Sequence, residues 1–260
     1  MVFFGYNFLP PYLRYGVMDA AGKLTHESEI NIPRAVFMHD FLITESYSLF
    51  FDLPVTITIN GLKYQPELGA RIGVVPRLGT DKDVRWIPIE PCWVYHFLNA
   101  HEEGNQIVMR GCRRLEFPGG ASNLHQWTID LSSGKLSEAD LDLAPCEFPT
   151  FNPRHMGRMS RYGYCASGNG EVEGTLKYDL IARTRKVFPF RAQQRGGEAL
   201  FVADPAGKNE DDGWLLNIVY DGAKDNSELL ILDAHDLSQV ATVELPRRVP
   251  FGFHCNWLPG

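Results

Sequence analysis

Residues 127–131 read Trp-Thr-Ile-Asp-Leu, residues 176–180 read Leu-Lys-Tyr-Asp-Leu, and residues 229–233 read Leu-Leu-Ile-Leu-Asp. In each stretch apolar residues lead to an aspartate, and a turn and a second strand-like stretch follow. The three aspartates lie 49 and then 54 positions apart. A repeat of ~40–50 residues made of short antiparallel strands is typical of a β-propeller blade. About five such repeats would fit in the 260 residues of the chain.

Strand-like stretches also dominate the remaining sequence. They are short and rich in β-branched and aromatic residues, and they cover residues 47–53, 93–98, 106–111, 127–131, 175–180, 186–190 and 214–220. Residues 132–135 and Asp221-Gly222 indicate hairpin turns. No long segment keeps an apolar period of 3.6 residues, and 17 prolines and 24 glycines interrupt potential helices. The sequence therefore predicts an all-β fold, a β-propeller, with a sandwich of similar hairpins as the alternative.

The composition limits the class of partner. The chain is 44% hydrophobic and 22% charged, which is ordinary for a globular domain with a sizeable core. Its formal net charge is −7 and its basic clusters are short, so we expect no nucleic-acid partner. No run of about 18 apolar residues predicts a membrane-spanning helix. The five cysteines are odd in number and form no C-x-x-C pair, which favours the reducing cytoplasm.

The first residues read as the inside of a strand, because Val2, Phe3, Phe4 and Tyr6 are apolar or aromatic. They carry no basic segment and are followed by Pro10-Pro11, which argues against a signal peptide. A domain seldom begins in core-like sequence. We therefore expect residues 1–260 to be part of a longer domain, and the propeller ring to be incomplete.

Three of the eight histidines have aromatic and aliphatic neighbours: His39, His96 and His254. A single histidine in such a place is usually a hydrogen-bonded core residue. Three such histidines near strand ends can instead converge on one point. The inner strands of all blades of a propeller meet at its axis, so histidines far apart in the sequence can come together there. Neutral imidazoles bind zinc, copper, nickel or iron, and spacing alone does not choose among these metals.

Two glutamates lie in apolar, strand-like surroundings where a lone carboxylate is costly to bury: Glu147 and Glu198. Either the N–H of a metal-bound imidazole or an arginine could serve as the partner. The other histidines are expected to have no direct role. His26, His125, His155 and His235 have polar or turn-like surroundings, and His101 reads as a solvated loop residue.

Several long segments, in order, resemble the carotenoid cleavage oxygenase family, which includes apocarotenoid and lignostilbene dioxygenases. The similar segments are residues 37–45 with 49–54, residues 95–102, residues 147–154 with 161–164, residues 198–202 with 210–213, and residues 230–234 with 250–254. The first two surround His39 and His96, and the last ends at His254. The resemblance runs through nearly the whole chain and places it in the C-terminal portion of the family's domain.

The resemblance implies a seven-bladed propeller with Fe(II) on its axis, held by four histidines that include His39, His96 and His254. By the same resemblance, Glu147 would orient His96 and Glu198 would orient His254. It implies a dioxygenase that uses O2 to split a carbon–carbon double bond of an apolar polyene or stilbene into two carbonyl products. An apolar substrate would favour peripheral contact with a membrane.

The family's first iron histidine and third supporting glutamate have no counterpart in these residues, and His26 is not assigned as a replacement. Two other hypotheses therefore stay open. The chain could be a catalytically inert propeller fragment that binds a hydrophobic ligand or a partner chain. It could also be a propeller hydrolase with a zinc or calcium site, such as a lactonase, although such sites usually recruit carboxylate or amide ligands.

Overall fold

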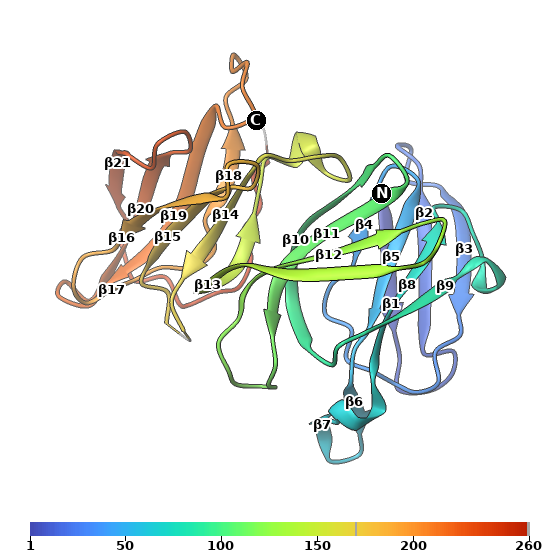
Figure 1. Ribbon diagram of the computed structural model, residues 1–260. Coiled ribbons are helices and arrows are strands. Elements are labelled where there is room, and N and C mark those ends of the chain that lie inside the picture. Colours follow the sequence, from blue (N-terminus) through green and yellow to red (C-terminus); the bar gives the residue numbers. More distant parts are fainter. Residues whose placement is uncertain (170, 259–260) are drawn as a thin grey trace.

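The computed structural model describes residues 1–169 and 171–258, and its regular secondary structure consists almost entirely of antiparallel strands (Figure 1). The first sheet contains β1 (Val2–Tyr6), β2 (Leu13–Met18) and β3 (Leu24–Ile30). The second contains β4 (Leu42–Ile43), β5 (Tyr47–Asp52), β8 (Ala70–Pro76) and β9 (Arg85–Ile89). A separate hairpin, β6 (Val55–Thr58) with β7 (Gly61–Tyr64), extends from the second sheet (Figure 1).

The third and fourth sheets share one long strand, β13 (Leu136–Thr150). Its first part pairs with β12 (Asn123–Asp130), next to β11 (Gln106–Arg114) and β10 (Trp93–Glu103). Its last residues pair with β14 (Tyr162–Ser167), which continues to β15 (Gly174–Asp179) and β16 (Thr184–Pro189). One strand thus leaves one four-stranded blade and begins the next.

The fifth sheet contains β17 (Gln194–Arg195), β18 (Leu200–Ala203), β19 (Gly213–Asp221), β20 (Asn226–Asp233) and β21 (Gln239–Glu244). Three short 3-10 helices complete the regular structure: η1 (Pro66–Leu68), η2 (Asp81–Asp83) and η3 (Pro153–His155). Successive antiparallel sheets of this kind are propeller blades. The predicted all-β propeller is therefore confirmed, and the chain supplies only part of a ring.

The repeated aspartates occupy one position in the blade. Asp130, Asp179 and Asp233 are the last residues of β12, β15 and β20. Each carboxylate accepts hydrogen bonds from the turn that follows it, for example from the backbone N–H of Ser133 at 2.8 Å and of His235 at 2.7 Å. The repeat that predicted the blades is thus a turn-stabilising device, since an aspartate can hydrogen-bond backbone groups two or three residues ahead.

Aromatic side chains pack the second blade against the third. Phe51 lies with its ring centroid 4.3 Å from that of Phe97 and 5.3 Å from that of Trp127, and both Phe51 and Trp127 are buried. Offset and edge-on ring contacts of this kind add to the burial of apolar surface. This packing joins the two blades in one core.

Two expectations from the sequence need correction at this level. The N-terminal strand is only half inside: Val2 and Phe4 pack against the core, but Phe3 and Tyr6 are 37% and 40% exposed and β1 lies at the edge of its sheet. His101 is not in a solvated loop, because it belongs to β10 and is buried. In the part of the chain described here, no helix has the length and apolar character needed to cross a membrane.

Candidate metal centre

His39 lies in the irregular segment that leads into β4, at the inner end of the second blade. Its Nδ1 is 3.0 Å from the carbonyl oxygen of Tyr95. A carbonyl can only accept, so the proton of the neutral ring is on Nδ1 and the lone pair is on Nε2. Burial and the neighbouring His96 ring hold the pKa of His39 below its ordinary value. Both effects favour the neutral imidazole, which is the form that binds metals.

His96 lies in β10, where the strand bulges. Val94 pairs with Arg113 and Phe97 pairs with Gly111, so Tyr95 and His96 together face the single residue Cys112. A bulge adds a residue, bends its strand and turns a side chain out of the regular alternation. Gly111 allows this close approach, because a Cβ there would lie 2.7 Å from an atom of the Phe97 ring.

Glu147 supports His96 from the next blade. Its Oε2 lies 2.6 Å from His96 Nδ1, and both side chains are largely buried. The strand β13 also bulges here, because Glu147 pairs with Ala166 and Thr150 with Tyr164. Within this bulge, Phe148 has a positive φ of 48° and its ring stacks on His96. The bulge thus places both a carboxylate and an aromatic ring against the imidazole.

His254 approaches from the segment after the fifth blade. Its Nδ1 is 3.3 Å from Oε1 of Glu198, whose other oxygen accepts the backbone N–H of Cys255 at 3.0 Å. Its Nε2 lies 3.2 Å from the Nε2 of His96. Because the two glutamates hold the Nδ1 protons, both facing Nε2 atoms carry lone pairs when the rings are neutral. Two lone pairs at this distance repel one another unless a cation or a proton lies between them.

The imidazoles of His96 and His254 fit a metal site, and the ring of His39 lies beside that of His96. The rings of His39 and His254 each lie edge-on to that of His96, with centroids 4.9 and 4.8 Å away. Each Nδ1 has an acceptor and each Nε2 is left for a ligand, which is the usual arrangement of metal-binding histidines. A separation of 3.2 Å also suits two nitrogens at about 2.1 Å from a shared ion.

Asp40 also belongs to this site, although no sequence pattern indicated a role for it. Its Oδ2 accepts the backbone N–H of Phe97 at 2.9 Å and its Oδ1 that of Phe41 at 2.7 Å. Burial raises the pKa of this carboxyl, whereas the two hydrogen bonds lower it. Asp40 therefore ties the segment of His39 to the strand of His96.

Arg114 was also missed. Its Nη2 lies 3.1 Å from Oε1 of Glu147, and its guanidinium stands over the ring of Tyr95, 4.8 Å from the centroid. The sequence left an imidazole and an arginine as alternative partners of Glu147, and this carboxylate contacts both. The only sequence feature that indicated a cation near Glu147 was the pair Arg113-Arg114. The register of β11 decides which of the two side chains contacts the site.

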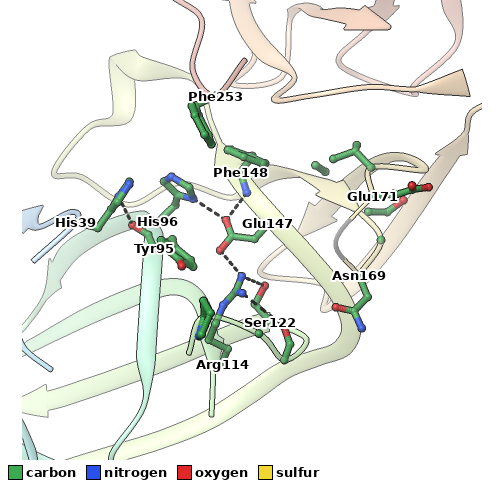
Figure 2. A pocket seen from close by; sticks show the side chains of 17 residues that line it. His39, Tyr95, His96, Arg114, Ser122, Glu147, Phe148, Asn169, Glu171 and Phe253 are labelled. Carbon is green, nitrogen blue, oxygen red and sulfur yellow. Dashed lines mark hydrogen bonds and ion pairs between the residues drawn. The ribbon is translucent and has the colours of Figure 1, made fainter. Parts of the chain in front are cut away.

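A cavity of about 420 Å³ opens beside His39 and His96, as Figure 2 shows. Aromatic rings of Tyr95, Phe148 and Phe253 line it together with Arg114 and Glu147. This volume is within the range of small-molecule sites, about 300–1,000 Å³. His254 lines another cavity of about 250 Å³ with Glu198, and Phe253 lines both cavities.

The remaining histidines lie elsewhere, and two of them differ from the expectation: His26 is in a strand instead of a turn, and His101 is buried. His125 is in β12 and buried, with Nδ1 2.6 Å from Oδ1 of Asp140. His26 is in β3 and its Nε2 lies 2.9 Å from the carbonyl oxygen of Gly79. None of the three has a described contact with His39, His96 or His254. His155 and His235 are in η3 and a turn, as expected.

The fold and the imidazole cluster define a β-propeller protein with a histidine-rich centre at the inner ends of its blades. The family described as retinal pigment epithelial membrane protein matches residues 1–259. The chain belongs to this family, whose members include proteins named as carotenoid cleavage oxygenases.

Two relatives show the range of activities named in the family. The carotenoid 9,10(9',10')-cleavage dioxygenase of Crocus sativus is 34% identical over 98% of this chain and 54% of its own length. The isoeugenol monooxygenase of Pseudomonas nitroreducens is 32% identical over 96% of this chain and 60% of its own length. The chain thus spans little more than half of these relatives.

A solved structure has the same fold. It is the cobalt-substituted apocarotenoid oxygenase of Synechocystis, which superimposes with a TM-score of 0.89 at 29% identity. The match covers 95% of this chain and 58% of that one. That protein contains cobalt, which agrees with the histidine-rich donor set found here.

Proposed function

We propose that this chain carries most of the active site of a non-haem iron(II) dioxygenase that cleaves a carbon–carbon double bond with O2. The observation that carries the proposal is the facing pair of Nε2 atoms of His96 and His254, 3.2 Å apart, each ring held through Nδ1 by its own glutamate. His39, His96 and His254 would be three of the iron ligands, and the chain would be the C-terminal part of a single propeller domain.

The metal and the protein would divide the reaction between them. Iron(II), when bound, supplies the position at which O2 is activated. Glu147 and Glu198 keep the Nδ1 protons of their histidines in place, so the Nε2 lone pairs stay directed at one point. In the overall reaction the C=C and O–O bonds break and two C=O bonds form. Both oxygen atoms enter the products, and no further reductant is required.

The cavity suits an uncharged, conjugated substrate. The rings of Tyr95, Phe148 and Phe253 offer flat apolar faces, which pack well against a polyene or an aromatic ring. The charges in the wall are paired: Arg114 with Glu147, and Glu171 with Arg195. An anionic or cationic substrate would therefore have no free countercharge among these groups. A carotenoid, an apocarotenoid or a stilbene meets these requirements.

A test is iron content and product formation in the full-length protein. We expect about one iron per chain and two carbonyl products from an apocarotenoid or a stilbene, with loss of both in His96→Ala. His155→Ala is the matched control, because its Nδ1 contacts only the Met159 carbonyl at 2.9 Å and a carboxylate at 4.0 Å. A folded full-length protein that binds no iron and cleaves neither substrate would overturn the proposal.

The second candidate is a catalytically inert propeller that binds a hydrophobic ligand. It is favoured by one observation: three histidines gather here, whereas the resemblance implies four. An inert scaffold would keep its ligand affinity in the His39, His96 and His254 alanine variants and would have no metal to lose. A zinc or calcium hydrolase is less compatible, because Glu147 and Glu198 are engaged with imidazole Nδ1 atoms.

The proposed partners and location follow from the same chemistry. O2 and an apolar polyene or stilbene are the reactants, and such a substrate favours peripheral contact with a membrane. We retain the cytoplasm as the proposed location, because all five cysteines are free.

A further inference from the structure

Three cysteines from different strands meet beneath the candidate centre. Cys112 lies in β11, Cys146 in β13 and Cys165 in β14. Their Sγ atoms all lie within 4.8 Å of one another, and those of Cys112 and Cys146 are 3.9 Å apart. All three side chains are completely buried. The sequence places them far apart, so only the pairing of the strands creates this cluster.

The position of the cluster is tied to the two bulges. Cys112 is the single residue opposite the bulge of Tyr95 and His96, and Cys165 is the single residue opposite the bulge of Phe148 and Pro149. Cys146 directly precedes Glu147. The thiols therefore point into the space between the third and fourth blades, among Leu98, Leu124 and Leu176.

We propose that Cys112, Cys146 and Cys165 form a second metal site, separate from the histidines, for a monovalent thiophilic cation, namely copper(I). Thiolate ligands select soft metals such as copper(I) and zinc. Three sulfurs at about 2.3 Å from an ion in their plane would be about 4 Å apart, close to the observed 3.9 Å. Zinc usually requires four ligands, and the described cluster has three.

The thiols of the cluster interact with one another. The hydrogen bond between Cys112 and Cys146 holds the pKa of Cys146 below its ordinary value and that of Cys112 above it. Thiolates are the forms that bind metals, so copper(I) would displace the remaining thiol protons on binding.

Loading of this site is expected to depend on opening of the blades. The cysteines have no exposed surface, but Glu147 and Ala166, the chain neighbours of Cys146 and Cys165, line the cavity of about 420 Å³. Copper(I) should therefore enter readily during refolding and slowly in the folded protein. A histidine-bound ion beside the open cavity should exchange rapidly by comparison.

The test is anaerobic titration of the full chain with copper(I) against a copper(I) chelator, after refolding in the presence of the ion. We expect one tightly bound copper per chain, with affinity at least 100-fold weaker in Cys146→Ala and Cys165→Ala. Cys92→Ala is the matched control, because Cys92 is equally buried but lies in the second and third blades' core, away from the cluster. His96→Ala should retain the copper.

Two outcomes would overturn the proposal: copper uptake that survives in Cys146→Ala, or uptake that is lost in His96→Ala. If the cysteine variants fail to fold, X-ray absorption of the copper-loaded unaltered chain decides the question. Sulfur neighbours alone at about 2.3 Å would support the site. Nitrogen neighbours would assign the ion to the histidines, and a disulfide between Cys112 and Cys146 without copper would likewise contradict it.

Discussion

The Nδ1 atom of His96 and the Oε2 atom of Glu147 lie 2.6 Å apart across the boundary between two blades. His96 belongs to β10 of the third sheet, and Glu147 belongs to the part of β13 that begins the fourth. The imidazole is therefore oriented by a strand that is not its own. The orientation of the His96 imidazole therefore depends on the relative position of the two blades and on the bulges in β10 and β13.

Replacing Glu147 by Gln should weaken metal binding without unfolding the chain. The amide can still approach His96 Nδ1, but it lacks the negative charge that strengthens the imidazole as a ligand. Loss of such a supporting group typically costs about 10–100-fold in metal affinity. Iron titration of the full-length protein measures it. Glu171→Gln is the control, since Glu171 lines the same cavity but pairs with Arg195; equal weakening in both variants would contradict the assignment.

Replacing Arg114 by Met should lower both stability and metal affinity. Glu147 would lose its cation in a largely buried setting, and we expect a decrease of about 1–3 kcal/mol in the free energy of unfolding. Urea denaturation measures the first effect and iron titration the second. Arg110→Met is the control on the same strand, because Arg110 Nε donates to Gln126 at 2.9 Å and has no contact with Glu147. Unchanged metal affinity in Arg114→Met would argue against its role.

The buried pair of Lys177 and Asp211 should be strongly sensitive to loss of one charge. The Nζ and Oδ2 atoms are 2.5 Å apart, and the side chains are only 7% and 3% exposed. Asp211→Asn leaves the ammonium without its counterion, and breaking a buried pair costs about 3–5 kcal/mol.

Urea unfolding checks this expectation against an exposed pair. Lys224 and Glu244 lie 2.6 Å apart with side chains 49% and 72% exposed. Glu244→Gln should change the free energy of unfolding far less, because exposed ion pairs contribute little to stability. Lys177→Met combined with Asp211→Leu should recover part of the loss, since an uncharged pair removes the unpaired ion. Similar effects of Asp211→Asn and Glu244→Gln would contradict the prediction.

Asp130 should remain ionised to unusually low pH. Hydrogen bonds from Ser132 and Ser133 lower its pKa to about 2, against about 3.9 for an ordinary aspartate. A depressed pKa stabilises the folded state above the ordinary value, and this contribution is lost as the pH falls from about 4 to about 2. The difference in stability between the unaltered chain and Asp130→Asn should therefore shrink across that interval.

Carboxyl NMR titration measures the pKa of Asp130 directly. Ser133→Ala should raise it, because the Ser133 hydroxyl donates to Oδ1 of Asp130 at 2.8 Å and alanine lacks this donor. Ser238→Ala, in the turn after β20, should leave it unchanged. A midpoint near 4 in the unaltered chain would contradict the turn-stabilising role of the repeated aspartate.

The blades could be predicted because their signal is local. The spacing of Asp130, Asp179 and Asp233 records a turn that each aspartate stabilises within a few residues, and strand propensity adds to it. His39, His96 and His254 could be selected for a related reason, since their apolar neighbours are adjacent in the sequence. Local composition gave the wrong exposure for other histidines. His101 and His125 have polar neighbours in the sequence, but both are buried in strands.

The sequence by itself determined the all-β class, the repeat, some of the strands and the histidines and glutamates of the candidate centre. Only the tertiary structure decided that Glu147 contacts both His96 and Arg114, that Asp40 joins two segments, and that three cysteines meet. These relationships depend on strand register and on bulges, where a shift of one residue turns a side chain to the opposite face. No local pattern records such a shift, because pairing partners lie tens of residues apart.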